Sequence, residues 1–163
     1  MTVAIRDARE QDLDAIVAFE IEIARISFGE SAVEDPVVHR KRVAEALGKE
    51  REGTFVAAQD QVLGWVWISL RKNFLTGEQY GFLRSLAVAE HARGTDVAEA
   101  LLERAMAFGA EHGVGEVTGK VHVSNAAMRV AYRAAGFAPE HLTMRRVLRP
   151  LAPPAERPAS RPR

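Results

Sequence analysis

The sequence contains no cysteine, so disulfide bonds, thiolate metal sites and a cysteine nucleophile are all excluded. It also lacks an excess of charge, since 22 Lys and Arg balance 22 Asp and Glu, which argues against a nucleic-acid partner. No apolar run approaches the length of a membrane span, and residues 1–16 contain no apolar core of signal-peptide length. The five histidines are scattered without ligand spacing. These absences favour a cytoplasmic protein without a metal, membrane or nucleic-acid partner.

The composition that remains is that of one folded domain. The chain has 163 residues, of which 47% are apolar and 27% charged, enough to bury a sizeable core. Residues 150–163, by contrast, are rich in Pro, Ala and Arg and contain little to bury. We therefore predict a single domain over residues 1–149, followed by a disordered tail.

Hydrophobic periodicity predicts an alternation of strands and helices. Helices are expected from about residue 10 to the break at "SFGESAVED", and over about 36–50, 95–111 and 125–136. Strands are expected over about 2–6, 54–58, 62–70, 80–88, 114–123 and 142–148. Asp35 before Pro36 is a favourable helix opening, and Gly136 is expected to close the last helix. This order predicts an α/β (α+β) fold, with parallel pairing around residues 91–102.

The stretch "HARGTDVAEALL", residues 91–102, joins a strand to the start of a helix. Such a turn presents unpaired backbone N–H groups at the positive end of the helix dipole, which suits it to bind an anion. Arg93 adds a cation and Gly94 adds flexibility, whereas Asp96 adds a carboxylate. An ordinary capped turn without a ligand is the alternative.

A second pair of residues lies further along the chain. Asn125 and Tyr132 are seven residues apart, so they share one face of a helix about two turns apart. Asn125 could equally be a plain N-cap, and Tyr132 could be a core residue with its hydroxyl in water.

Taken together, these motifs resemble the GNAT superfamily of acetyl-coenzyme A-dependent N-acetyltransferases. The resemblance runs from "IRDAREQDLDAI" to "GFAPEHLTMRRVL" and so covers nearly the whole chain. The pyrophosphate-loop pattern of the family falls on Arg93, Asp96 and Ala98, with Asp96 in place of its middle glycine. The later signature of the family falls on Asn125, Tyr132 and the pair Gly136–Phe137.

The resemblance implies a fold and a reaction. The fold is a mixed, mostly antiparallel central sheet with a splayed parallel pair and helices on both faces. The reaction moves an acetyl group from acetyl-coenzyme A to a primary amine of a small molecule or protein, by direct attack through a tetrahedral intermediate. A homodimer is an open possibility, because such folds often dimerise.

The resemblance also implies how acetyl-coenzyme A is held. The backbone of Leu86, Ala87 and Val88 would polarise the thioester carbonyl, as preorganised donors do. Tyr132 would give the departing thiolate a proton, and with Asn125 it would contact the cofactor. The pyrophosphate would be bound by the turn residues Arg93, Gly94, Thr95, Asp96, Val97 and Ala98.

The general base is missing from its expected place. Many relatives have a glutamate on the strand that here reads "YGFLRSLAV", which contains none. Glu78 lies just before this strand, and Ser85 within it could hold a water. His122 and a water chain to solvent are the alternatives.

The acceptor pocket is expected near "SFGESAVED", with Phe28, Glu30 and Glu34 as its residues. Carboxylates there would suit a cationic amine, although a solvated acidic loop is the alternative. Trp65 and Trp67 share one face of a strand and could line a pocket or simply pack within the sheet.

The carboxylate of Asp96 sets two functional hypotheses against each other. Two unit charges 4 Å apart interact by about 1–4 kcal/mol, while a micromolar complex is worth about 8 kcal/mol. We therefore expect a weakened cofactor site that is still used. The alternative is an inactive binding protein of the same fold, which would have no chemical need for Tyr132.

Overall fold

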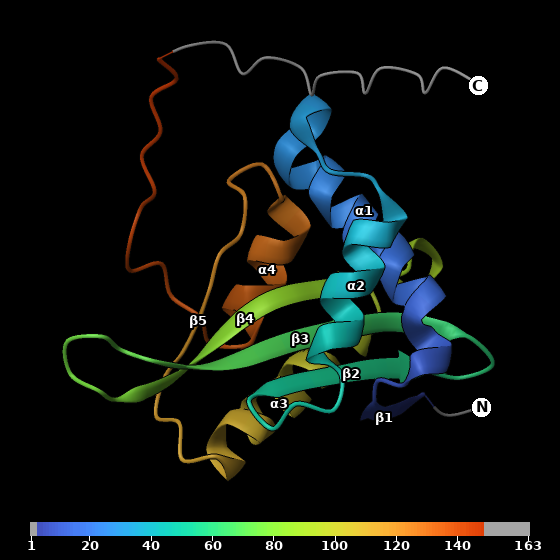
Figure 1. Cartoon of the computed structure of the whole chain (residues 1–163), viewed down its shortest axis with the longest axis horizontal. Helices are drawn as coiled ribbons and strands as arrows, with labels where there is room; N and C mark the ends of the chain where they lie inside the picture. The colour runs from blue at the N-terminus through green and yellow to red at the C-terminus, as the bar shows by residue number, and fades with distance from the viewer. Residues whose placement is uncertain (1–2, 149–163) are drawn as a thin grey trace, which may run out of the picture.

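The computed structural model describes residues 3–148, in which four helices cover the two faces of a five-stranded sheet (Figure 1). The strands are β1 (Ala4–Asp7), β2 (Glu52–Ala58), β3 (Val62–Lys72), β4 (Gln79–Val88) and β5 (Val117–Gly119). The helices are α1 (Leu13–Phe28), α2 (Pro36–Ala46), α3 (Val97–Glu111) and α4 (Ala126–Ala134). Three short 3₁₀ turns are η1 (Glu10–Asp12), η2 (Gly29–Ser31) and η3 (Glu90–Ala92). None of the described helices is both long and apolar enough to cross a membrane.

The strands lie in the sheet in chain order. β1 to β4 pair antiparallel, whereas β5 pairs parallel with β4 over three residues that end at Leu83 and Gly119. β4 then continues to Val88 without β5, so the parallel pair separates. This confirms the predicted mixed, mostly antiparallel sheet with helices on both faces.

Two apolar layers hold the helices against the sheet. On one face, α1 and α2 bury the indoles of Trp65 and Trp67, which are 0% and 2% exposed. On the other face, α3 and α4 pack on the opposite side chains of β3 and β4. The predicted stripe of α3 lies in this second layer: Val97, Leu101, Ala105 and Phe108. The two tryptophans therefore pack beneath helices.

The helix ends follow the sequence closely. The Asp35 carboxylate accepts a hydrogen bond from Val37 N at 2.9 Å, and Pro36 follows as the first helical residue. Asn125 Oδ1 accepts from Met128 N at 3.1 Å at the start of α4. Gly136 has φ +85° directly after α4, a conformation that other residues adopt at a steric cost. These three predicted helix ends are confirmed.

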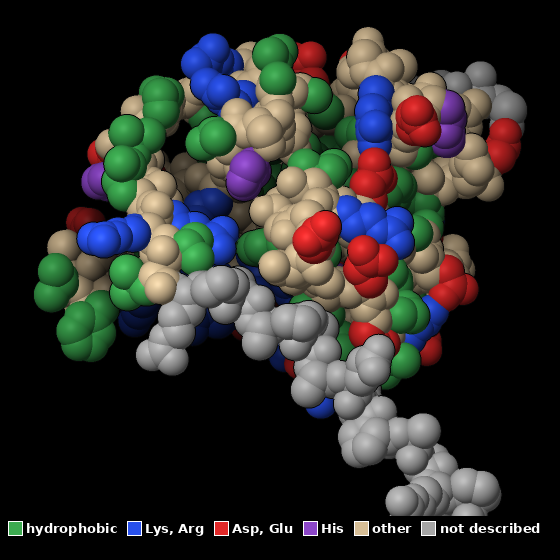
Figure 2. All heavy atoms as spheres, turned by 90° about the horizontal axis from the view of Figure 1, so that it is seen from above, with side chains coloured by type: hydrophobic (Ala, Val, Ile, Leu, Met, Phe, Trp, Pro, Cys, Tyr) green, Lys and Arg blue, Asp and Glu red, His purple; other side chains and the backbone are tan. Residues whose placement is uncertain are grey.

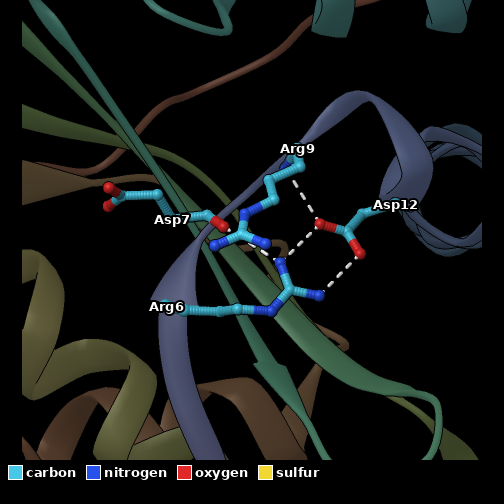
Figure 3. Close-up of polar contacts among 4 residues, drawn as sticks. All are labelled: Arg6, Asp7, Arg9 and Asp12. Atoms are coloured by element: carbon cyan, nitrogen blue, oxygen red, sulfur yellow. Dashed lines mark hydrogen bonds and ion pairs between the residues drawn. The ribbon is translucent and has the colours of Figure 1, made fainter.

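A buried carboxylate fixes the junction between β1 and α1 (Figure 3). Asp12 accepts hydrogen bonds from both terminal nitrogens of the Arg6 guanidinium, at 2.7 and 2.9 Å, and from Arg9 N at 2.8 Å. The bonds from Arg6 are the main reason that the pKa of Asp12 lies below its ordinary value.

The strand predicted over residues 142–148 is wrong, because the structure has no strand there. This segment leaves the body as an extended chain (Figure 1), and the side chains of Leu142 and Met144 are 83% and 87% exposed. β5 is also shorter than the predicted 114–123. Alternating apolar residues favour extended backbone, but a strand forms only where a second edge pairs with it.

Candidate active site

The turn between β4 and α3 offers unpaired backbone donors. Gly94 has φ +80° and open space around it, and Thr95 Oγ1 bonds to Ala92 O at 2.6 Å. Among the residues that the structure describes, the N–H groups of Gly94, Asp96 and Ala98 have no hydrogen-bond partner. These donors lie at the positive end of α3, so the turn fits a bound phosphate group.

Asp96 is the N-cap residue of α3, but its carboxylate makes no capping hydrogen bond and is exposed. Its φ of −73° is one that any residue adopts, so the backbone does not require glycine here. Arg93 is engaged elsewhere: its Nε donates to Val88 O at 3.2 Å, and its guanidinium pairs with Glu22 of α1. The Arg93 guanidinium therefore does not pair with the Asp96 carboxylate in the structure.

Tyr132 of α4 lies where β4 and β5 separate. A Cβ added to Gly119 would come within 3.2 Å of the Tyr132 ring and hydroxyl, so the tyrosine occupies the space that this glycine leaves open. Phe137 stacks on the Tyr132 ring with centroids 5.0 Å apart. The pair Gly136–Phe137 thus ends the helix and supports the tyrosine ring.

Burial reinforces the protonated state of this phenol. Tyr132 is 9% exposed, and burial raises its pKa to about 12. The hydroxyl is therefore protonated throughout the neutral pH range and available as a hydrogen-bond donor.

A carboxylate that the sequence reasoning missed lies beside Ser85 of β4. Glu20 of α1 is 3% exposed, and one of its oxygens lies 3.5 Å from the Arg42 guanidinium. Its other oxygen, Oε1, is buried without a hydrogen-bond partner among the described residues. Burial is the main cause of the raised pKa of Glu20, which the neighbouring Ser85 and Arg42 oppose.

The sequence does contain a signal for Glu20. It lies four residues after Ile16 and four before Ala24, both of which are buried on the sheet-facing side of α1. A glutamate within an apolar helical stripe must lose its hydration on folding, which is rare without a functional or ion-pairing reason.

Comparison with known proteins identifies this arrangement. The model of the acetyltransferase (GNAT) family matches residues 4–137. The chain belongs to the acetyltransferase (GNAT) family. It is accordingly an acyltransferase enzyme, and the open turn, the splayed strands and Tyr132 all lie within the matched residues.

Solved structures share the fold of this acetyltransferase at low sequence identity. A transcriptional regulator from Bacillus halodurans C-125 is 17% identical, with a TM-score of 0.75 over 90% of this chain and 99% of that chain. AAC(6')-Iy, in complex with the bisubstrate analogue CoA-S-monomethyl-acetylneamine, is 18% identical, with a TM-score of 0.71 and coverage of 90% and 99%. Glucosamine-6-phosphate N-acetyltransferase from Arabidopsis thaliana is 16% identical, with a TM-score of 0.67 and coverage of 91% and 100%. No match was found among curated proteins.

The other predicted site residues of this acetyltransferase lie apart from Tyr132 and Ser85. Glu78 is exposed in the turn between β3 and β4, seven residues before Ser85, or roughly 23 Å along an extended strand. His122 is exposed and its Nδ1 contacts Ser124 Oγ at 2.6 Å. Of the two base candidates on or before β4, the structure places only Ser85 next to a buried carboxylate.

The predicted acceptor residues lie at the end of α1 and just beyond it. Phe28 is 65% exposed, and Glu30 is exposed in η2. Glu34 forms an ion pair with Arg25 at 2.7 Å, and this hydrogen bond lowers the pKa of Glu34. The Glu34 carboxylate already has a cationic partner, and its role toward an amine stays a prediction.

Proposed function

We propose that this acetyltransferase moves an acetyl group from acetyl-coenzyme A to a primary amine of a small molecule or protein. The observation that carries the proposal is the position of Tyr132, which lies against Gly119 at the end of the β4–β5 pairing. β4 runs on from that gap through Leu86 to Val88 and into the turn with free N–H groups. The strand that would polarise the carbonyl and the turn that would bind the pyrophosphate are therefore consecutive in the chain, and Tyr132 of α4 lies where this strand parts from β5.

Each group has a distinct binding role. The N–H groups of Gly94, Asp96 and Ala98 hold the pyrophosphate, and the dipole of α3 adds to their attraction. Beyond the last β5 pairing, the backbone at Leu86–Val88 donates to the carbonyl oxygen as negative charge develops on it. Acetyl-coenzyme A itself supplies the activated thioester. Asn125 keeps α4 in register by capping it, and this positions Tyr132.

The transfer forms a bond from the amine nitrogen to the acetyl carbon and breaks the carbon–sulfur bond. Burial raises the pKa of Tyr132 to about 12, so the phenol keeps its proton while the sulfur departs. Tyr132 stabilises the leaving sulfur as a hydrogen-bond donor, and solvent delivers the final proton.

The amine must lose a proton before or during its attack. We assign Glu20 as the acceptor of that proton, acting through Ser85 or a water held by Ser85, because its Oε1 is unpartnered beside this strand. The raised pKa of Glu20 brings it nearer to neutrality, where a proton acceptor is most effective. This arrangement supplies from α1 the carboxylate that β4 lacks.

The alternative function is an inactive binding protein of the same fold, with an impaired pyrophosphate turn. The observation that favours it is the exposed, unpaired carboxylate of Asp96 at the start of α3. This alternative predicts that the chain catalyses no acetyl transfer, so that substitutions at Glu20 or Tyr132 change no measured rate.

The experiment that separates the two functions combines calorimetry with an assay of coenzyme A release. We expect purified protein to bind acetyl-coenzyme A in the micromolar range and to release coenzyme A faster when a panel of primary amines is added. No detectable binding to the native chain, with binding restored in Asp96→Gly and no turnover on any amine, would support the alternative. Absence of binding would contradict the proposed function.

A further inference from the structure

Three arginines gather on the face of the sheet that α1 and α2 cover only in part. Arg42 comes from α2, Arg71 from β3 and Arg84 from the bulge in β4, where Trp67 pairs with Ser85 and Ile68 pairs with Leu83. The bulge leaves Arg84 as an extra residue opposite no partner. The far halves of β3 and β4 extend past α2, so no helix covers this face of the sheet there (Figure 1).

Aromatic rings hold each of these guanidinium groups. Arg84 lies over the Trp67 ring at 4.4 Å from its centroid, and Arg42 lies over the same ring at 5.0 Å. Arg71 lies over the Phe82 ring at 4.0 Å. Cation–π stacking orients a guanidinium while leaving the N–H groups at its edge free to donate.

A half-buried carboxylate, Glu52, fixes the platform beneath two of them. Glu52 Oε2 accepts hydrogen bonds from Trp67 Nε1 and from Ser69 Oγ, each at 2.5 Å. Trp67 is 2% exposed, so its ring cannot turn without breaking this contact. Arg42 and Arg84 therefore stack on a ring that is held in place.

The cluster has more positive charge than its own carboxylates can balance. Among the described residues, neither Arg71 nor Arg84 forms an ion pair, while Arg42 lies 3.5 Å from Glu20. Burial and the nearby charge of Arg42 lower the pKa of Arg84, and the neighbouring carboxylates of Glu52 and Glu20 offset this only in part. Like charges held together in this way favour the binding of an anion between them.

The cluster lies within reach of the proposed transfer point. Arg84 is two residues before Leu86, or about 7 Å along an extended strand, and Arg71 pairs across from Tyr80 farther out on the same hairpin. Seen from above, the molecule is hollowed, and Lys or Arg side chains gather at the floor of the hollow (Figure 2). Arg84 directly precedes Ser85 on β4, so an acceptor bound at Arg84 lies next to Ser85.

We infer that Arg42, Arg71 and Arg84 form an anion-binding subsite for the acceptor, so that the amine acetylated by this enzyme carries a carboxylate or phosphate group close to its nitrogen. The inference rests on the proposed function and specifies its substrate class. It differs from the sequence-based expectation of acidic residues around a cationic amine. A planar guanidinium binds either a carboxylate or a phosphate through two parallel hydrogen bonds, and the experiment separates these two sources.

The kinetic test uses matched acceptors that differ only in charge. One pair is an amino acid and its amide, and the other is an amino sugar phosphate and the same amino sugar. We expect at least a tenfold higher kcat/KM for the anionic member of one pair. The pair that shows this preference tells whether the subsite binds a carboxylate or a phosphate. Arg84→Gln should remove that preference by raising KM for the anionic acceptor at least tenfold, while the Kd for acetyl-coenzyme A stays within twofold.

Arg104→Gln is the matched control for this variant. Arg104 stacks on the Phe55 ring at 4.2 Å, but it lies on α3 at the opposite face of the sheet. We expect this variant to keep the preference for the anionic acceptor. Equal turnover of both members of each pair by the native enzyme would overturn the inference.

A second measurement tests the subsite independently of turnover. Arg84 and Arg42 contact Trp67, so an anion that moves them changes the tryptophan fluorescence. We expect saturable changes on titration with inorganic phosphate or glutarate at constant ionic strength, and loss of these changes in Arg84→Gln and in Trp67→Phe. No saturable change, or an unchanged response in Arg84→Gln, would overturn the inference. Failure of acetyl-coenzyme A to bind would instead overturn the proposed function. The fluorescence titration would then test the anion-binding subsite by itself.

Discussion

At the scale of single residues, burial has opposite consequences for the two acidic groups of the candidate site. Desolvation raises the pKa of both Tyr132 and Glu20, because each would have to be charged in a medium of low polarity. For the phenol this preserves a hydrogen-bond donor at neutral pH. For the glutamate the same effect makes a stronger proton acceptor.

Replacing Tyr132 by Phe removes the donor but keeps the ring that packs on Phe137 and Gly119. We expect kcat to fall about 10- to 100-fold, because a hydrogen bond to a charged group contributes about 1.5–3 kcal/mol. The Kd for acetyl-coenzyme A, measured by calorimetry, should change less than twofold. Weaker binding with unchanged kcat would mean that the hydroxyl contacts the cofactor but does not assist departure of the sulfur.

Replacing Glu20 by Gln removes a buried charge, so we expect lower activity and a more stable fold. The folded-state pKa of Glu20 is raised, so its ionisation opposes folding, and stability is lost as the pH rises through that pKa. The Tm of Glu20→Gln should therefore exceed that of the native chain at pH 8. The difference should vanish below about pH 4, the unfolded pKa of glutamate.

The control for this variant is Glu45→Gln, since Glu45 is exposed on α2. We expect its Tm and activity to match those of the native chain at both pH values. Glu20→Asp, which keeps the carboxylate, should retain more activity than Glu20→Gln across the pH profile. Native activity in Glu20→Gln would remove Glu20 from the proton pathway.

Substitutions at Asp96 test how strongly one negative charge weakens the binding of acetyl-coenzyme A at the turn between β4 and α3. Asp96→Asn removes the charge and leaves a residue that caps helices equally well, so the backbone is preserved. We expect the Kd for acetyl-coenzyme A to tighten about 5- to 50-fold at low salt, because a charge 4 Å away contributes about 1–4 kcal/mol, reduced by exposure. Asp96→Gly should give a similar gain. An unchanged Kd in both variants would show that the carboxylate does not face the phosphates.

At the scale of elements, the junction of β1 and α1 depends on the ion pair between Arg6 and Asp12. Asp12→Asn should reduce the free energy of unfolding by about 2–3 kcal/mol, the value of charged hydrogen bonds that are lost. The folded pKa of Asp12 is depressed, so its contribution is present above about pH 4 and is lost as the pH falls through the folded value.

Urea unfolding at pH 7 and pH 3 measures this contribution, with Asp7→Asn as the control. Asp7 is exposed, and its backbone oxygen, rather than its side chain, accepts a hydrogen bond from Arg6. We expect the control to match the native chain. An Asp12→Asn variant as stable as the native chain at pH 7 would show that water replaces the pair without loss.

At the scale of the whole molecule, the two layers on either side of the sheet lie within residues 3–137. A chain that ends at residue 149 should therefore keep the Tm within about 2 °C, and should keep its affinity for acetyl-coenzyme A. Thermal unfolding and calorimetry on the shortened chain check this prediction of a single domain. A large loss of either would assign residues 150–163, which lie outside the described residues, to the folded unit.

Chain association is the other question at this scale. Leu142, Met144 and Leu148 are each more than 80% exposed on the extended segment after α4. A homodimer, left open by the sequence, is not tested by the structure, and sedimentation velocity of the native chain would test it.

Much of this fold follows from local sequence. The caps at Asp35 and Asn125, the αL glycine at Gly136 and the buried stripe of α3 depend on residues a few positions apart, so periodicity and turn chemistry predict them. The turn at residues 93–98 and the position of Tyr132 on α4 were likewise predicted by spacing. Their catalytic and binding roles stay predictions.

Only the tertiary structure decided which distant residues meet. Glu20 and Ser85 are 65 positions apart, and Arg42, Arg71 and Arg84 come from three elements; packing of α1 and α2 on the sheet brings each set together. The strand predicted at 142–148 failed for the same reason, because pairing depends on a neighbouring edge and not on the pattern within the segment. Sequence by itself determined the helices, most of the strands and the turn before α3, while burial of side chains between elements determined the environment of Glu20 and the clustering of the three arginines.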